Sequence, residues 1–192
     1  DYGVIMMKYL DEFQKTGDLG PMMSAVHESY YQKLLESLKF FQGDEGTLRE
    51  LIRAEIDKKN ILNLLKAKES NVEKEILSNH LVNGGRISTK ELLDIYEVKD
   101  VAEIIGRTES YFKLSDALEQ YKTNQSLIVF EIALTKLINT NFVKKLKNIA
   151  LSIGTIFYFM YNAEYEHENL KRIMYGKRYE LSTDKIKEML LL

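Results

Sequence analysis

The chain has 192 residues, of which 45% are hydrophobic and 29% are charged, and its formal net charge is −2. This composition provides enough apolar side chains for a sizeable core in one or two folded domains. The near-neutral charge gives no electrostatic basis for nucleic-acid binding, and the absence of cysteine excludes both disulfide bonds and thiolate metal sites.

The spacing of the hydrophobic residues predicts an all-α fold. Apolar residues recur at intervals of three and four rather than two, as between Leu34 and Phe41. The single proline, Pro21, leaves long helices uninterrupted. Helix starts are predicted at three capping boxes, and helix breaks at three sites that contain glycine. The boxes are Thr47 with Glu50, Ser70 with Glu73 and Ser88 with Glu91, and the breaks are residues 43–46, residues 83–85 and Gly106.

The most apolar segment of the chain is residues 149–161, which includes Phe157 and Phe159. A helix that spans a membrane needs about 20 apolar residues. This segment is shorter than that, and the polar residues Asn162 and Glu164 follow it directly. The sequence therefore predicts a buried core helix here and no membrane span.

An internal repeat is the most informative feature of the sequence. Six residues recur at an offset of 109, and three earlier ones recur at an offset of 108. Ser70 and Ser182 match at 112, which predicts a three-residue insertion in the second copy after Lys177. The pairs at 109 are Glu55 and Glu164, Asp57 and Glu166, Asn60 and Asn169, Ile61 and Leu170, Leu64 and Ile173, and Lys68 and Lys177; those at 108 are Leu10 and Leu118, Phe13 and Tyr121, and Leu19 and Leu127.

This repeat predicts two homologous helical domains, residues 1–83 and 84–192. Residues 84 to about 108 have no counterpart in the first copy, so the chain is expected to begin inside a repeat. A period this long indicates duplicated helical domains rather than a solenoid of short repeats.

The repeated residues share one face of a helix, because positions i, i+3, i+4, i+7 and i+11 lie on the same side. Asn60 and Asn169 each lie within a stripe of apolar residues. A buried amide without a partner costs about 1–3 kcal/mol, so each Asn is expected to bond to a packed neighbour and to fix the helix register. The alternative is that this face lines a surface that binds another protein of a larger complex.

Residues 164–173, followed by Gly176-Lys177, form an acidic helix with an Asn-Leu pair, a basic pair that includes Arg172, and a short final helix. Residues 152–154, residues 52–68 and Gly84-Gly85-Arg86 extend the pattern, although Leu62 stands where the second copy has a basic residue. In order and spacing, residues 5–192 resemble the last two of the three repeats of the C subunit of archaeal and vacuolar-type (A/V-type) rotary ATP synthases. That protein is equivalent to the d subunit of vacuolar ATPases.

The resemblance implies a non-catalytic subunit of the central stalk, without cofactor or metal. In the family, three wedge-like domains form a funnel with pseudo-threefold symmetry on the cytoplasmic face of the membrane. The funnel connects the proteolipid (c-type) ring to the central shaft subunits and couples ion translocation to ATP synthesis or hydrolysis. Two wedges alone do not close such a funnel. The repeat-motif residues, structural or part of a subunit interface, are Glu55, Asp57, Asn60, Lys68, Glu164, Glu166, Asn169, Arg172 and Lys177.

Two other classes of function remain open, a helical adaptor unrelated to rotary motors and a carboxylate-metal enzyme built on a helical bundle. Glu164 and His167 have the Glu-x-x-His spacing of di-iron bundles, but Lys58 occupies the position of the histidine in the first copy. A phosphate-binding loop is not predicted, since Gly176-Lys177 is followed by Arg178 and lacks the upstream glycine.

Overall fold

The computed structural model describes residues 2–38, 45–147 and 153–191, and these residues form helices and connecting turns without a β-strand. The predicted all-α fold is confirmed. The helices are α1 (Tyr2–Thr16), α2 (Gly20–Ser37), α3 (Glu45–Glu69), α4 (Lys74–Ser78), α5 (Thr89–Tyr96), α6 (Val101–Thr108), α7 (Ser115–Asn124), α8 (Ile128–Ile138), the π-helical turn η2 (Asn139–Val143), α9 (Lys144–Leu146), α10 (Ile153–Arg178) and α11 (Thr183–Met189).

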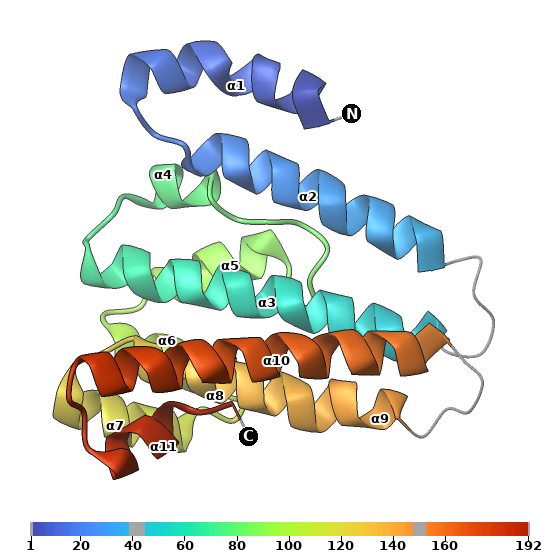
Figure 1. Cartoon of the computed structure of the whole chain (residues 1–192). Coiled ribbons are helices and arrows are strands. Elements are labelled where there is room, and N and C mark those ends of the chain that lie inside the picture. Colours follow the sequence, from blue (N-terminus) through green and yellow to red (C-terminus); the bar gives the residue numbers. More distant parts are fainter. Residues whose placement is uncertain (1, 39–44, 148–152, 192) are drawn as a thin grey trace.

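The long helix α3 organises the core. It packs against α2, α4, α5, α6, α8, η2 and α9. In Figure 1, α1, α2, α3 and α10 follow one another from the top of the molecule downwards, with the short helix α4 between α2 and α3. Helix α1 packs against α2 and contributes no buried residue. The fold is therefore built outward from α3, with α1 and α10 at its margins.

One hydrophobic cluster extends from Leu38 to Leu146 and includes Leu64, Ile87 and Phe130, which are all fully buried. This core crosses the predicted domain boundary between residues 83 and 84. Side chains of residues 1–83 and of residues 84–192 therefore pack in one common core. The division of the chain into two homologous domains at this boundary stays a proposal.

The serine cap of one of the three predicted capping boxes is confirmed, while the carboxylate of its Glu91 accepts a hydrogen bond from the Tyr111 hydroxyl. Ser88 precedes α5, and its hydroxyl accepts a hydrogen bond of 3.2 Å from the Glu91 amide. The prediction at Thr47 is wrong, because α3 already includes that residue. The prediction at Ser70 is also wrong: its amide still donates to Lys66 at the end of α3, and α4 begins only after Glu73.

The predicted helix breaks have different outcomes. Residues 83–85 do form a turn, in which Gly84 has a φ of +104° that favours glycine. Gly106 lies inside α6, where a Cβ would meet no atom within 4 Å, so nothing in its surroundings requires a break. Of the predicted break at residues 43–46, residues 43 and 44 lie outside the described residues, and Gly46 belongs to α3.

For the part of residues 149–161 that the structure describes, the predicted helix is confirmed, but the predicted burial holds for only one of its faces. This part forms the start of α10, where Phe157 and Tyr161 pack against the core but Ile156, Phe159 and Met160 are exposed. Residues 149–152 lie outside the described residues. No helix among the described residues has the length and hydrophobicity needed to cross a membrane.

A contact between His27 and Lys59 links α2 to α3 and makes the stability depend on pH. The Lys59 ammonium donates to His27 Nδ1 over 2.6 Å. Burial, and then the Lys59 charge, lower the pKa of His27 from its ordinary value of 6.5. Below that value the unfolded chain binds a proton that the folded chain does not, so stability is lost as the pH falls.

Replacing His27 with Gln should remove this pH dependence. We expect the free energy of unfolding of the wild type to fall more steeply than that of His27→Gln as the pH decreases below 6.5. Urea unfolding of both proteins above and below this pH measures the difference. Parallel pH profiles for the two proteins would contradict the assignment.

Candidate functional site

Two asparagine bridges connect the C-terminal halves of α3 and α10 to the chain that returns past them. Asn60 donates from Nδ2 to the Val82 carbonyl over 2.8 Å and accepts from the Val82 amide over 2.9 Å. Asn169 has the same relation to Leu191, with distances of 3.4 and 2.7 Å. Both partners, like both asparagines, are 109 residues apart. The amides thus bond as expected of residues that fix the register of a helix.

A second bond recurs beside each bridge. Arg172 donates from Nη1 to the Met189 carbonyl over 2.6 Å, and Asn63 donates to the His80 carbonyl over 2.9 Å. These donors and acceptors are again 109 residues apart. Asn63 is a repeat residue that sequence comparison missed, because the basic pair of the second copy was compared with Leu62. Extending the comparison at the offset of 109 by one residue, from Lys171 and Leu62 to Arg172 and Asn63, would have found it.

The turns after the two long helices also repeat at this offset. Asn71 and Glu180 both have positive φ, at 51° and 55°. Glu73 precedes α4 as Ser182 precedes α11, and Ser182 caps its helix through the Lys185 amide. The predicted three-residue insertion is wrong, since Ser182 corresponds to Glu73 and not to Ser70. The recurring geometry is consistent with a duplicated helical unit.

The two copies differ at the remaining repeat residues. Asp57 is buried, pairs with Arg86 Nε over 2.8 Å and accepts from the Ile87 amide over 3.1 Å. Lys68 donates to the Tyr96 carbonyl at the end of α5 over 2.9 Å. Their counterparts Glu166 and Lys177 are exposed on α10, and the described part of the chain gives them no equivalent bonds. Asp57 and Lys68 therefore tie α3 to residues 84–96.

Arg86 is enclosed by charge and aromatic rings. Its guanidinium lies 4.7 Å from the Phe112 ring centroid and 5.4 Å from that of Phe142. Nη2 of Arg86 is buried and makes no hydrogen bond to the described residues. Burial raises the pKa of the Asp57 carboxyl, while the hydrogen bond from Arg86 opposes the shift. This ion pair is a structural element of the core.

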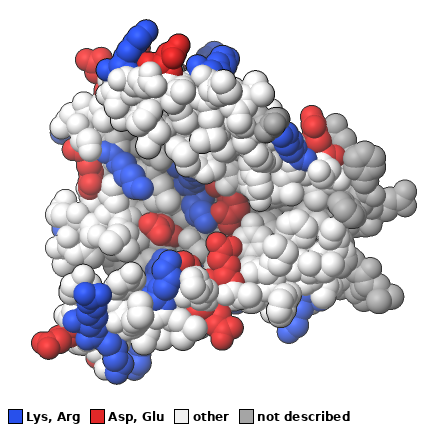
Figure 2. All heavy atoms as spheres, turned by 45° about the horizontal axis from the view of Figure 1, so that its top comes forward, with Lys and Arg blue, Asp and Glu red and all other residues white. Residues whose placement is uncertain are grey.

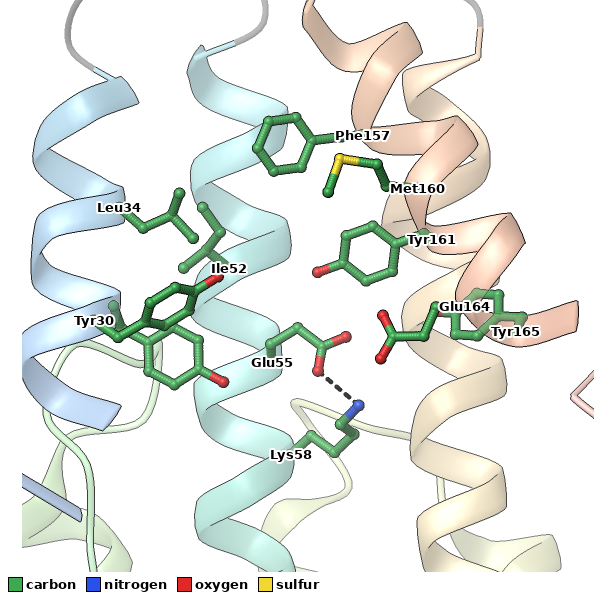
Figure 3. Close-up of a pocket in the computed structure, with 11 residues that line it drawn as sticks. Tyr30, Leu34, Ile52, Glu55, Lys58, Phe157, Met160, Tyr161, Glu164 and Tyr165 are labelled. Atoms are coloured by element: carbon green, nitrogen blue, oxygen red, sulfur yellow. Dashed lines mark ion pairs between the residues drawn. The ribbon is translucent and has the colours of Figure 1, made fainter. Parts of the chain in front are cut away.

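A groove between α2, α3 and α10, hereafter the α3–α10 groove, has a cavity volume of about 320 Å³. Figure 3 shows Glu55 of α3 and Glu164 of α10 pointing toward each other across it. These carboxylates occupy the same repeat position, 109 residues apart. Lys58 pairs with Glu55 over 2.6 Å. The lining residues are Tyr30, Tyr31, Leu34, Ile52, Glu55, Lys58, Phe157, Met160, Tyr161, Glu164 and Tyr165.

Four tyrosines give this groove an aromatic wall. Burial, and then Glu55, raise the pKa of Tyr31 to about 12 and also raise the pKa values of Tyr161 and Tyr165. Their hydroxyls therefore stay protonated and remain hydrogen-bond donors near neutral pH. The Tyr165 hydroxyl is buried and has no partner among the described residues. The sequence placed Tyr161 and Tyr165 only in the apolar stripe that contains Asn169, and it did not single out Tyr30 and Tyr31, because no repeat pair has a tyrosine in both copies.

The charge in the groove is predominantly acidic, with two carboxylates and one ammonium group. Figure 2 shows acidic and basic side chains together around a hollow in the middle of one face, with further charged side chains along the upper and left edges of that face. No three His, Asp or Glu side chains are grouped to hold a metal ion within residues 2–38, 45–147 and 153–191. The groove presents aromatic surface, donor hydroxyls and negative charge, which suit an apolar segment that carries basic residues.

Comparisons with known proteins agree with the resemblance seen in the sequence. The chain is 33% identical over 190 residues to a protein of Thermoplasma volcanium and 32% identical over 176 residues to one of Thermoplasma acidophilum. A protein of Methanocaldococcus jannaschii is 25% identical over 195 residues. All three bear the name of the C subunit of A-type ATP synthase.

These matches cover 99%, 92% and 100% of this chain but 53%, 49% and 49% of the relatives, so the chain spans about half their length. No solved structure matches the chain. The model of the ATP synthase (C/AC39) subunit family matches residues 1–189. The predicted resemblance is thereby confirmed, and the chain belongs to the ATP synthase (C/AC39) subunit family.

Proposed function

We propose that this chain is a non-catalytic part of the central stalk of an A/V-type ATP synthase. In this role it connects the proteolipid ring to the central shaft subunits, and so couples ion translocation to ATP synthesis or hydrolysis. It contributes two of three helical repeats to a funnel on the cytoplasmic face of the membrane. Membership of the ATP synthase subunit family supports the complex, and the α3–α10 groove supports the contact with the shaft.

The observation that carries the proposal is the convergence of Glu55 and Glu164 in this groove. Two residues from the same repeat position reach one hollow from two different helices. Equivalent residues of a pseudo-symmetric funnel converge toward its axis, which is where the funnel receives a shaft. The aromatic wall of the groove supplies large contact area, and its carboxylates attract basic side chains.

The asparagine bridges supply the stiffness that a part under torque needs. Asn60, Asn169 and Arg172 bond to backbone groups of their own copy, so they fix the helices instead of contacting a partner. Glu55 and Glu164 instead line the groove, where a partner can reach them. This division separates the repeat motif into residues that hold the fold and residues that face the shaft.

A binding experiment with the purified shaft subunits tests this proposal. The double variant Glu55→Gln and Glu164→Gln, in the full-length subunit, should bind the shaft about tenfold more weakly, because two negative charges are lost at the centre of the contact. Isothermal titration calorimetry measures the affinity, and circular dichroism verifies the fold.

The matched control is Glu188→Gln, which removes one exposed carboxylate from α11, outside the groove. It should bind like the wild type. Equal affinities for the wild type and the double variant would contradict a contact in the α3–α10 groove. Failure of the wild-type full-length subunit to bind either shaft or ring would favour the alternative of an adaptor unrelated to rotary motors.

A further inference from the structure

Lys58 places a positive charge inside the α3–α10 groove, where it neutralises one of the two carboxylates. Its ammonium pairs with Glu55 over 2.6 Å, and the side chains of Lys58 and Glu55 are only 22% and 14% exposed. In Figure 3 the Lys58 ammonium lies below the carboxylates of Glu55 and Glu164. Of the described residues that line the groove, Lys58 alone is basic. The groove therefore holds one counterion of its own.

Glu164 has no such counterion. It is exposed on α10 and forms no hydrogen bond or ion pair with the described residues. His167 occupies the repeat position of Lys58 in the second copy, but it is exposed and does not line the groove. Two carboxylates and one ammonium group leave the groove with one negative charge in excess. An incoming cation thus meets one carboxylate without a partner and one that is paired with Lys58.

The aromatic wall favours a guanidinium as this cation. The rings of Tyr161 and Tyr165 lie edge to face with their centroids 6.0 Å apart. Tyr165 is 8% exposed, and its hydroxyl has no partner among the described residues. A guanidinium is planar, weakly hydrated and carries five donors, so it stacks on aromatic rings and can bond to carboxylates and a hydroxyl oxygen together. An ammonium is more strongly hydrated and carries three donors, so the groove suits arginine better than lysine.

We propose that an arginine of the shaft binds between Glu55 and Glu164, and that Lys58 is the internal counterion that this arginine displaces. The inference rests on the proposed function, because it takes the shaft as the partner of the groove. In the free subunit, Lys58 prevents Glu55 from being a largely buried charge without a partner. A segment without a positive charge gives no compensation for separating Lys58 from Glu55, so Lys58 makes the groove selective for a basic partner.

Lys58→Met in the full-length subunit tests the role of this lysine, since methionine keeps much of the length of the side chain but not its charge. The variant should bind the purified shaft subunits about fivefold more tightly than the wild type, because the arginine no longer competes with an internal cation. Its affinity should also fall more steeply with sodium chloride concentration, because the groove then carries two excess negative charges instead of one. Isothermal titration calorimetry at two salt concentrations measures both effects.

Lys171→Met is the matched control. Lys171 pairs with Glu168 over 2.7 Å, at the same spacing of three residues as Lys58 and Glu55, but neither Lys171 nor Glu168 lines the groove. This variant should bind the shaft like the wild type at both salt concentrations. Circular dichroism verifies the fold of both variants.

Replacing the arginines of the shaft with glutamine, one at a time, tests the other half of the proposal. One of these changes should weaken binding to the wild-type subunit by at least about tenfold. The same change should weaken binding to the double variant Glu55→Gln and Glu164→Gln much less, because the arginine then has no carboxylates to contact. Equally tight binding by every arginine variant of the shaft would overturn the proposal.

Binding of Lys58→Met that is no tighter than that of the wild type would also overturn it. Tighter binding with an unchanged salt dependence would do the same, because the lysine would then obstruct the shaft by its size and not by its charge. Either result, with a wild type that binds the shaft, leaves the proposed function intact. Failure of the wild type to bind the shaft would instead contradict the proposed function and this inference together.

Discussion

Replacing Asp57 with Ala is expected to lower the free energy of unfolding by about 3 kcal/mol. The substitution leaves the Arg86 guanidinium in the core without its counterion, and removing one partner of a buried ion pair costs about 3–5 kcal/mol. The lower end applies because the Arg86 side chain is 20% exposed. Urea unfolding followed by circular dichroism near neutral pH measures the loss.

Glu166→Ala is the matched control, because Glu166 occupies the same repeat position but is exposed on α10. Its effect should stay within about 0.5 kcal/mol. The double variant Asp57→Ala and Arg86→Met should lose less stability than the sum of the single variants, since it leaves no unpaired charge. A loss for Asp57→Ala no larger than that for Glu166→Ala would show that the ion pair does not hold α3 to residues 84–96.

Replacing Asn60 with Ala is expected to cost about 2 kcal/mol of stability. Asn60 is fully buried and exchanges two hydrogen bonds with Val82. Alanine removes both bonds and leaves the Val82 amide and carbonyl without partners inside the protein, which costs about 1–3 kcal/mol. Thermal and urea unfolding of the variant measure the effect.

The corresponding change Asn169→Ala should cost less, about 1 kcal/mol. Asn169 is only partly buried, and its bond to the Leu191 carbonyl is long at 3.4 Å. Water can replace the lost partner at this end of the molecule. If Asn169→Ala destabilised the protein as much as Asn60→Ala, the difference in burial between the two asparagines would not determine how much each bridge contributes to stability.

The helices and the repeat register were predictable because both follow from the spacing of residues along the chain. A period of three to four residues identifies a helix regardless of what surrounds it. The offset of 109 at Asn60 and Asn169 carries over to the bonds with Val82 and Leu191, which lie outside the compared motif. Local pattern therefore predicted which residues are equivalent.

Helix ends were less predictable, since one sequence can fit two local structures. Ser70 and Glu73 match a capping box, yet Ser70 ends α3 because its amide still bonds to Lys66 and Asn71 adopts positive φ. Ser88 has the same pattern and does begin a helix. Gly106 remains helical because its neighbours in α6 bury a strongly amphipathic face. The tertiary surroundings decided each case.

Burial and the groove could not be predicted, because both depend on which helices meet. Hydrophobicity alone does not predict burial on α10: Ile61 and Leu170 are similar side chains at the same repeat position, but only Ile61 is covered. In the α3–α10 groove, Glu55 and Glu164 were found through the repeat. Tyrosines of α2 and α10 join them only through the approach of α2, α3 and α10.

The most direct test of a coupling function is the ratio of ions transported to ATP hydrolysed by the reconstituted ATP synthase in vesicles. With the wild-type full-length subunit, ATP hydrolysis should drive ion uptake. With the double variant Glu55→Gln and Glu164→Gln, hydrolysis should continue while ion uptake per ATP falls. Unchanged ion uptake per ATP in an enzyme that lacks the subunit altogether would contradict the account.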